Sequence, residues 1–508
     1  MRWMAGIPAT VALVAAAKLL LHLAFAHRYN YFRDELYYIA CSRHLDWGYV
    51  DQPPLIAVLV WLEMHLGGTS LTALRFLPAL AGAALVVLTA LLAREMGAGK
   101  FGQSFAALSC AAVGIYFVMQ YLMTMNAFEP LFWMGCAYVF VRIINTGNQR
   151  LWLWFGALAG LGLQNKYSMG VFGAGLVAGL LLSAERKALA RRWIWMGGGV
   201  ALLIFLPNLL WNMGHHWPFV ELMANIKASG RDVVLGPAEY FVQQIFIIGP
   251  ALFPLWMAGL LWLFFSADGR RYRPLAWAYV AALALFIGMK GKNYYLAPAY
   301  PMLLAAGTVP LERLLARWGR PWLKPALVLL VLTPAMLLLP LGLPVLSAEN
   351  FLRYEEKLPF ALPVSEKSHA GAAMPQYYSD QFGWEEMTAA VARTWNGLTP
   401  AEREVACIGG RNYGEAGAID FFGPRYGLPP AISAHQNYFL WGPRDCTGKI
   451  LILLGDRPEN LRGRCESAEV AAELHHPYAV LFENKPVIVC RGLRTDLRAL
   501  WPRLKIWN

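Results

Sequence analysis

Two adjacent carboxylates, Asp34 and Glu35, are the residues of this chain whose types and position could do chemistry. They lie in the polar stretch 31–55, directly after one apolar segment and ahead of others. Removing a charge from water at a membrane boundary is costly, so acids in such a place indicate a site. A carboxylate beside a bilayer can also have a raised pKa, which suits removal of a proton from a hydroxyl group. The alternative is a structural acid that caps a helix or pairs with Arg33 or Arg43.

The composition places these acids in a membrane protein. Of 508 residues, 57% are hydrophobic, only 15% are charged, and 20 are tryptophan. A soluble protein of this composition would expose too much apolar surface. The net charge of +12 does not indicate nucleic-acid binding, because most of the surplus lies in short connections between apolar segments.

The apolar segments predict about eleven spanning helices, each near the roughly 20 residues that a bilayer requires. The fifth and sixth are short, as expected for helices that end below the membrane surface around a polar cavity. The expected spans are 5–26, 70–93, 103–122, 127–144, 151–164, 168–183, 194–214, 241–266, 274–289, 293–309 and 325–345.

The distribution of lysine and arginine predicts the topology. If the N-terminus is cytoplasmic, the even-numbered connections carry most of the basic residues, as the positive-inside rule requires. Because the number of spans is odd, the loop at about 27–69 and everything after about residue 346 then face the outside. The first helix is expected to stay as an uncleaved anchor, since no small-residue cleavage site follows it.

The sequence predicts two domains, a transmembrane domain at 1–345 and a globular periplasmic domain at 346–508. In the second, the segments 404–408, 450–454 and 487–490 have the pattern of buried strands between turns. This tail also carries an even number of cysteines on the oxidising side of the membrane, so either disulfides or ordinary buried thiols are consistent with the pattern. These cysteines are Cys407, Cys446, Cys465 and Cys490.

Five motifs of the membrane part and one of the tail resemble the bacterial members of the protein O-mannosyltransferase and lipid A aminoarabinose transferase superfamily. The resemblance implies the GT-C fold, a membrane all-α domain followed here by an extracytoplasmic α/β domain, in the bacterial inner membrane. The motifs are DELYY (34–38), HLDWGYVDQPPL (44–55), GLQNKYS (162–168), PNLLWNMGHHWP (207–218), KNYYLAPAYP (292–301) and NYGEAGAIDFFGPRYGLPPAISAHQNYFLWGP (412–443).

The resemblance implies an activity. Such a protein transfers one sugar, a hexose or a pentose, from a polyprenyl-phosphate donor to a lipid A or lipopolysaccharide, other glycan, lipid or protein acceptor, with inversion at the anomeric carbon. The expected partners are this donor, the acceptor and membrane lipids, and the expected state is a monomer. No cofactor is firmly implied, a divalent cation stays open, and no metal ligands are assigned. The alternatives are a lipid-linked sugar transporter or flippase, which would show repeat-like halves, and an oligosaccharide ligase.

The resemblance also implies roles for single residues. Asp34 is expected at the catalytic centre, with Glu35 beside it. Glu129 is a further acid, although Asn126 matches the family position equally well. The donor phosphate needs cations that can be reached from the outside, for which Lys166, Lys292, Tyr294, Tyr295 and Arg33 are the candidates, although lysines and tyrosines at a membrane boundary are often only anchors.

One departure from the family lies in the segment VDQPP. Aminoarabinose transferases carry glutamate and lysine there, with the lysine at the donor phosphate, whereas this chain carries Asp51 and Gln52. An amide brings no charge, so the phosphate must be neutralised elsewhere, and aminoarabinose itself becomes a doubtful substrate. Asp51 before two prolines also fits a simple turn. His44 and His216 complete the candidates in the outer loops.

Overall fold

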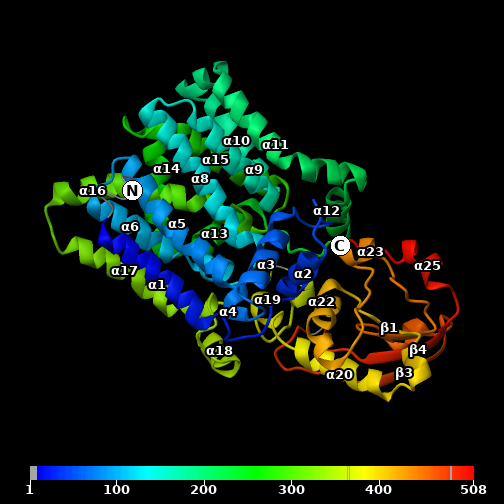
Figure 1. Cartoon of the computed structure of the whole chain (residues 1–508). Helices are drawn as coiled ribbons and strands as arrows, with labels where there is room; N and C mark the ends of the chain where they lie inside the picture. Colours follow the sequence, from blue (N-terminus) through cyan, green and yellow to red (C-terminus); the bar gives the residue numbers. More distant parts are fainter. Residues whose placement is uncertain (1–7, 363, 365, 481–482) are drawn as a thin grey trace. The chain divides into compact units, whose positions relative to one another are not determined.

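The structure, a computed structural model, describes residues 8–362, 364, 366–480 and 483–508. The chain divides into two compact units (Figure 1). The first, called the helical unit, comprises Met1–Arg28, Gly67–Leu210 and Val234–Val345. The second, called the mixed unit, comprises Tyr29–Leu66, Trp211–Val233 and Leu346–Asn508. The mixed unit therefore joins the carboxylate loop to the C-terminal tail, and one break between the units lies at residues 345/346.

Each of the eleven apolar segments contains helix where the structure describes it, and the first of them, 5–26, is described from residue 8 onward. The α-helices of the helical unit are α1 (Ala9–Phe25), α4 (Leu71–Leu74), α5 (Phe76–Glu95), α6 (Lys100–Ala111), α7 (Gly114–Met119), α8 (Met125–Thr146), α9 (Leu151–Asn165), α10 (Met169–Leu181), α11 (Arg192–Gly214, whose last residues belong to the mixed unit), α13 (Pro237–Ile248), α14 (Phe253–Phe265), α15 (Arg273–Gly288), α16 (Tyr300–Trp318) and α17 (Leu323–Leu337).

Several of these helices are shorter than the sequence pattern predicts. In the described part of the chain, three helices are long and apolar enough to cross a membrane, or up to five if each bent pair forms one span. The expected segment 103–122 is interrupted between α6 and α7, and the segment 293–309 begins as a 3₁₀ helix, Asn293–Ala299. Breaks of this kind arise at glycine and proline. The protein is a multi-pass membrane protein. By length and composition, however, fewer than eleven of the described helices qualify as complete spans.

Glycines allow close packing between helices of this unit. A Cβ atom on Gly156 of α9 would collide with the carbonyl oxygen of Gly197 of α11. Gly259 of α14 and Gly307 of α16 would likewise collide with backbone carbonyl groups of the facing helix. Lipid is as apolar as leucine, so membrane helices associate through such close backbone contacts rather than through burial of apolar surface alone.

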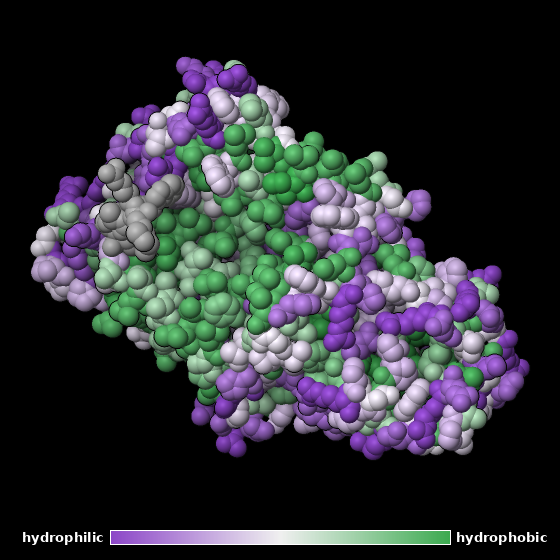
Figure 2. Space-filling model, in the orientation of Figure 1, coloured by the Kyte–Doolittle hydropathy of each residue, from purple (hydrophilic) through white to green (hydrophobic). Residues whose placement is uncertain are grey.

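The outer surface of the helical unit is apolar. Figure 2 shows hydrophobic side chains gathered over α1, α11 and α17. Only 11% of the apolar window of α11 is buried, and large side chains such as Leu203, Phe265 and Leu329 are exposed. A soluble surface rarely carries so much contiguous apolar area, whereas a lipid-facing surface requires it.

The mixed unit contains one four-stranded sheet with the strand order β1-β2-β4-β3. β1 (Ala406–Gly409) pairs with β2 (Ile450–Leu453) in parallel, and β4 (Val487–Leu493) pairs antiparallel with β2 and with β3 (Cys465–Ala472). The α-helices of this unit are α2 (Arg33–Arg43), α3 (Leu55–Leu66), α12 (Pro218–Ser229), α18 (Ala348–Glu355), α19 (Gln376–Ser379), α20 (Trp384–Gly397), α21 (Pro400–Arg403), α22 (Tyr413–Phe422), α23 (Gln436–Trp441), α24 (Pro458–Leu461) and α25 (Leu497–Leu500).

The three strands expected in the tail coincide with β1, β2 and β4, whereas β3 was not expected. Five of the eight residues of β3 are exposed and three are glutamate or serine, because it is an edge strand, and it therefore lacks the apolar run that marked the others. A mostly helical fold with a small C-terminal mixed sheet is thereby confirmed.

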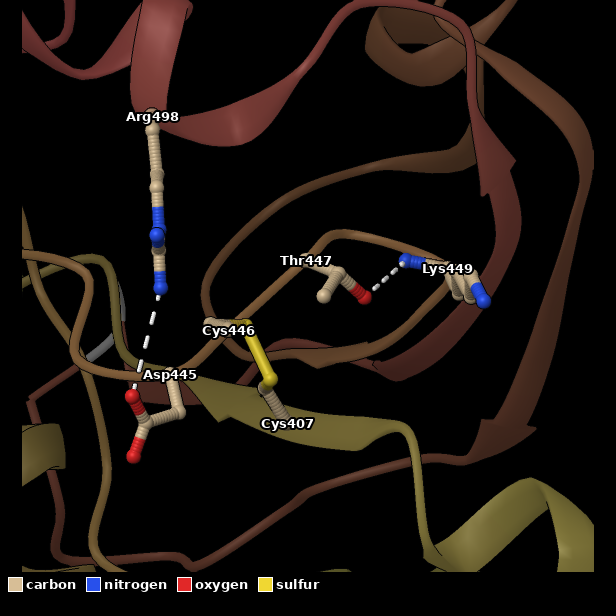
Figure 3. Close-up of a disulfide and its surroundings, with 6 residues drawn as sticks. All are labelled: Cys407, Asp445, Cys446, Thr447, Lys449 and Arg498. Carbon is tan, nitrogen blue, oxygen red and sulfur yellow. Dashed lines mark hydrogen bonds and ion pairs between the residues drawn. A yellow bond between two sulfur atoms is a disulfide. The ribbon is translucent and has the colours of Figure 1, made fainter.

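Two disulfides close the tail. Cys407 of β1 is bonded to Cys446 in the loop that precedes β2 (Figure 3), and Cys465 of β3 is bonded to Cys490 of β4. The cysteine pattern was consistent with disulfides or with buried thiols, and the structure contains disulfides. Bonds of this kind persist in oxidising compartments.

Candidate active site

The carboxylate loop forms α2, and Glu35 fixes where this helix begins. The Phe32 amide donates a hydrogen bond to Oε2 of Glu35, with the two atoms 2.8 Å apart. Glu35 is completely buried. A glutamate at the third helical position that returns to the N-cap amide satisfies one of the free N–H groups at a helix start. The carboxylate of Glu35 thus positions its neighbour Asp34.

Asp34 lies in the first turn of α2, beside a cation and a phenol. Its Oδ1 atom accepts a hydrogen bond of 2.7 Å from the hydroxyl group of Tyr413, the first residue of α22. The same oxygen lies 3.9 Å from Nε of Arg33. The Asp34 side chain remains 29% exposed, so the carboxylate can still meet a substrate.

Asp51, at the other end of the loop, is held by a different tyrosine. The Tyr37 hydroxyl donates a hydrogen bond of 2.9 Å to Oδ1 of Asp51, and the rings of Tyr37 and Tyr413 lie 4.7 Å apart. Two carboxylates are therefore held by two tyrosines whose rings contact each other.

Burial changes the protonation of both acids. It raises the pKa of the Asp34 carboxyl, while Arg33 and the Tyr413 hydroxyl act in the opposite direction. Burial also raises the pKa of Asp51, to about 7, against the hydrogen bond from Tyr37, and the nearby charge of Asp34 adds to this increase. Like charges in one site favour the protonated form of one partner. Near neutral pH the site can therefore hold one ionised and one protonated carboxyl group.

Arg33 is fixed by residues of the tail. Its backbone N–H donates to the carbonyl oxygen of Asp380 at 3.0 Å, and its guanidinium lies 3.4 Å from Oδ2 of the same residue. Asp380 is completely buried, and its Oδ1 lies 3.1 Å from Nε2 of His369. A buried carboxylate needs such partners. Arg33 is thus neutralised in part by Asp380 and keeps a defined place beside Asp34.

The other outer-loop candidates lie apart from Asp34. Gln52 is completely buried, its Nε2 lies 3.9 Å from Sγ of Cys41, and its Oε1 has no hydrogen-bond partner among the described residues. His44 packs on Trp441, with ring centroids 4.5 Å apart, and His216 is exposed with a φ of 60°. No direct contact joins these three candidates to Asp34 in the part of the chain that is described.

A second polar cluster lies in the helical unit at the start of α8. The ammonium group of Lys166 donates hydrogen bonds of 2.8 Å to Oδ1 of Asn126 and to Oε2 of Glu129. Ser168 donates to the other carboxylate oxygen of Glu129. Glu129, the expected further acid, and Asn126, the other residue that could match the family position, therefore both accept hydrogen bonds from the same lysine.

Two tyrosines border this cluster. The Lys166 ammonium lies 4.7 Å from the ring centroid of Tyr295 and 5.8 Å from that of Tyr294, within the range of cation–π attraction. Lys292 precedes the 3₁₀ helix that carries both tyrosines, and its carbonyl oxygen accepts a hydrogen bond from Tyr240 at 3.2 Å. The structure thus brings Lys166, Glu129, Tyr294 and Tyr295 together within the helical unit.

Sequence reasoning missed Tyr413 and Asp380 as partners of the carboxylate loop. The motif at 412–443 signalled that the first of them matters but not what it contacts, and the segment around Asp380 gave no signal. For metals, the described residues contain no group of three or more histidine, cysteine, aspartate or glutamate side chains that could hold an ion.

The fold of the chain is also found among solved structures. The structure is similar to ArnT from Cupriavidus metallidurans bound to undecaprenyl phosphate, with a TM-score of 0.64 and 15% identity over 94% of this chain and 97% of that one. The same protein in the apo state gives a TM-score of 0.61 with 16% identity over the same shares. The chain therefore has the ArnT-like fold.

Residues 51–211 match the family described as dolichyl-phosphate-mannose-protein mannosyltransferase. The lipid A galacturonosyltransferase RgtD of Rhizobium johnstonii is 28% identical over 244 residues. That match covers 44% of this chain and 48% of the relative, so it spans about half of each protein. Over residues 51–211 the match agrees with the expected resemblance to the mannosyltransferases, and the structure shows the ArnT-like fold.

Proposed function

We propose that this protein is an integral membrane glycosyltransferase that transfers one sugar from a polyprenyl-phosphate donor to lipid A. The family match, the lipid A galacturonosyltransferase relative and the fold shared with ArnT support the reaction class. The relative supports lipid A as the acceptor, and the ArnT structure with undecaprenyl phosphate supports this polyprenol in the donor.

The observation that carries the proposal is the environment of the Asp34 carboxylate. It is a carboxylate that is partly exposed, flanked by Arg33 and held by Tyr413. In the proposed reaction Asp34 accepts the proton of an acceptor hydroxyl group as its oxygen bonds to the anomeric carbon. The bond from that carbon to the phosphate oxygen breaks, and polyprenyl phosphate leaves with the electron pair. One such displacement inverts the anomeric carbon, and a positioned general base is the help that it requires.

The proposed phosphate ligands are Lys166 and Lys292. An ammonium group has three N–H donors, and Lys166 uses two of them on Asn126 and Glu129. The third can donate to a phosphate oxygen, and hydrogen bonds between charged groups are the strong ones. Gln52 lies completely buried in the mixed unit, which supports assigning the phosphate to other residues.

The proposed location is the bacterial inner membrane, with the tail in the periplasm. Eleven helical segments and a cytoplasmic N-terminus would put Asp34 and residues 346–508 on the outer side. The two disulfides of the tail support this side, since the cytosol keeps thiols reduced.

Mass spectrometry of lipid A tests the proposal. Cells that make the protein should contain a lipid A species heavier by one sugar, and cells without it or with Asp34→Asn should lack this species. Identical lipid A profiles in all three strains would contradict lipid A as the acceptor. Unchanged envelope glycans as well would contradict the transferase assignment.

A further inference from the structure

Tyr413, which the tail contributes to the surroundings of Asp34, is fixed at the backbone. Asn412 caps α22, because its Oδ1 accepts hydrogen bonds from the amides of Gly414 and Glu415 at 2.8 and 3.1 Å. The Arg411 amide donates a hydrogen bond of 2.5 Å to Oε2 of Glu415. The Asn412 amide also donates to Oε2 of Glu415 at 3.4 Å, so these two residues form one capping box that fixes the start of α22. The position from which the Tyr413 side chain departs is therefore set by α22 itself.

The Tyr413 ring is fixed as well. It packs against the imidazole of His435, 5.0 Å away and nearly parallel at 6°, and against the ring of Tyr37, 4.7 Å away. The Tyr413 amide also donates to Nδ1 of His435 at 3.2 Å. Burial and the charge of Arg33 lower the pKa of His435 to about 3, so a neutral imidazole is available to accept that bond. These contacts of the ring and the backbone restrict the orientation of the Tyr413 side chain.

Small residues bring α22 against α2. A Cβ atom on Gly414 would lie 2.5 Å from Cγ of Arg33, and one on Gly417 would lie 3.1 Å from the carbonyl carbon of Leu36. Real side chains do not tolerate the first of these distances. The glycines thus allow the close approach that places the Tyr413 hydroxyl 2.7 Å from Oδ1 of Asp34.

We infer that Tyr413 is a positioning residue for the transfer reaction, which holds one oxygen of Asp34 so that the other faces the acceptor hydroxyl. The inference rests on the proposed function and assigns a catalytic task to the C-terminal tail. Tyr413 has a second effect on the same carboxylate. Its hydroxyl lowers the pKa of Asp34 against the increase caused by burial, which favours the ionised form of the base.

Tyr413→Phe tests the inference, because it removes one hydroxyl group and keeps the stacked ring. We expect kcat to fall about 10-fold or more, as for loss of a hydrogen bond to a charged group, with the KM for the donor unchanged. The acidic limb of the kcat/KM profile should move to higher pH, because Asp34 then loses a contact that lowers its pKa. Tyr438→Phe is the matched control: this hydroxyl donates to Asp420 at 2.9 Å in the same unit and should leave the acidic limb in place.

The outcomes separate the inference from the function on which it rests. If the wild type transfers sugar, Asp34→Asn does not, and Tyr413→Phe keeps the wild-type kcat and acidic limb, the positioning role is wrong and the function stands. A lower kcat without movement of the limb would leave Tyr413 as a purely structural residue and also overturn the inference. If Asp34→Asn retains full activity, Asp34 is not the general base, and the proposed mechanism itself is wrong.

A second variant covers the case in which Tyr413→Phe does not fold. Difluorotyrosine at position 413 keeps the ring and the hydroxyl group but is a stronger hydrogen-bond donor. It should move the acidic limb to lower pH, opposite to the effect expected for phenylalanine. An acidic limb that stays at its wild-type position with this substitution contradicts the inference.

Discussion

Asp34 and Asp51 are two carboxyl groups of one loop that meet different surroundings. Asp34 has Arg33 and a tyrosine hydroxyl beside it, whereas Asp51 has the hydroxyl of Tyr37 and the negative charge of Asp34. Environments that push two pKa values apart are typical of sites that need an ionised and a neutral acid together.

The raised pKa of Asp51 predicts a pH-dependent stability. A group whose pKa is higher in the fold than in the unfolded chain contributes stability below its unfolded pKa, and this contribution is lost as the pH rises to its folded pKa of about 7. Asp51→Asn keeps an oxygen for Tyr37 and does not titrate. The variant should therefore gain thermal stability relative to the wild type between pH 4 and pH 8, by roughly 1–3 kcal/mol.

Melting curves of the purified protein at pH 5 and pH 8 measure this difference. Asp46→Asn is the control, since Asp46 is an exposed acid of the same loop that accepts a hydrogen bond from Trp211. A stability difference between Asp51→Asn and wild type that is the same at both pH values would show that Asp51 is not buried as described.

At this scale the sequence identified the acids but not their partners. Asp34 could be predicted because two carboxylates beside an apolar segment are unusual on physical grounds alone. Tyr413 could not, since it lies 379 positions away and meets Asp34 only after the tail has folded. Glu35 has the sequence appearance of a second catalytic acid, yet its carboxylate caps α2.

The positions of the helices could be predicted from the hydrophobic segments of the sequence. The breaks within them could not. Each of the eleven apolar segments contains helix where the structure describes it, because an unpaired backbone group in lipid is costly. Their ends depend on proline, glycine and local packing, so that α6 and α7 are two short helices in place of one. Within the carboxylate loop, the helix α3 after the two prolines agrees with a turn into a juxtamembrane helix, one of the interpretations of Asp51, whereas the bounds of α2 were not predicted.

Lys166, at the end of α9, and Lys292, before the 3₁₀ helix Asn293–Ala299, are the proposed phosphate ligands. Lys166→Ala and Lys292→Ala should each raise the donor concentration needed for half-maximal transfer and lower turnover, whereas Gln52→Ala should have a smaller effect. A charged hydrogen bond contributes roughly 1.5–3 kcal/mol, which corresponds to about 10–100-fold in donor binding. Lys290→Gln is the control, because Lys290 is an exposed neighbour of Lys292.

Loss of Lys166 alone also leaves Glu129 buried without its cation, which is destabilising by itself. The double variant Lys166→Met with Glu129→Gln removes both charges and separates this effect from donor binding. If donor binding is normal in both lysine variants and weak in Gln52→Ala, the phosphate lies at the VDQPP turn and the assignment of the lysines is wrong.

For the whole molecule, the oxidation state of the cysteines tests on which side of the membrane the tail folds. Cys41, Cys110 and Cys136 are free and buried, and the other four form the two disulfides. Denatured protein that has not been reduced should therefore take up a thiol reagent at three sites, and at all seven after reduction. Modification of seven cysteines without reduction would contradict an oxidising environment for the tail.

A reporter fused after Asn508 provides an independent check of the same topology. A reporter that is active only outside the cytoplasm should be active there. The sequence predicted the globular tail from its change in composition, but it could not predict that the loop 29–66 folds with that tail in one unit, because such grouping depends on contacts between distant segments.

Transfer by the purified protein tests the central claim most directly. The protein is reconstituted in liposomes with lipid A and an undecaprenyl-phosphate sugar, and the products are identified by mass spectrometry. We expect one sugar on lipid A with the wild type, a rate lower by roughly 10²–10⁴ with Asp34→Asn, and no product from a pyrophosphate-linked oligosaccharide donor. Equal rates for the wild type and a folded Asp34→Asn variant, or transfer only from the pyrophosphate donor, would contradict the account.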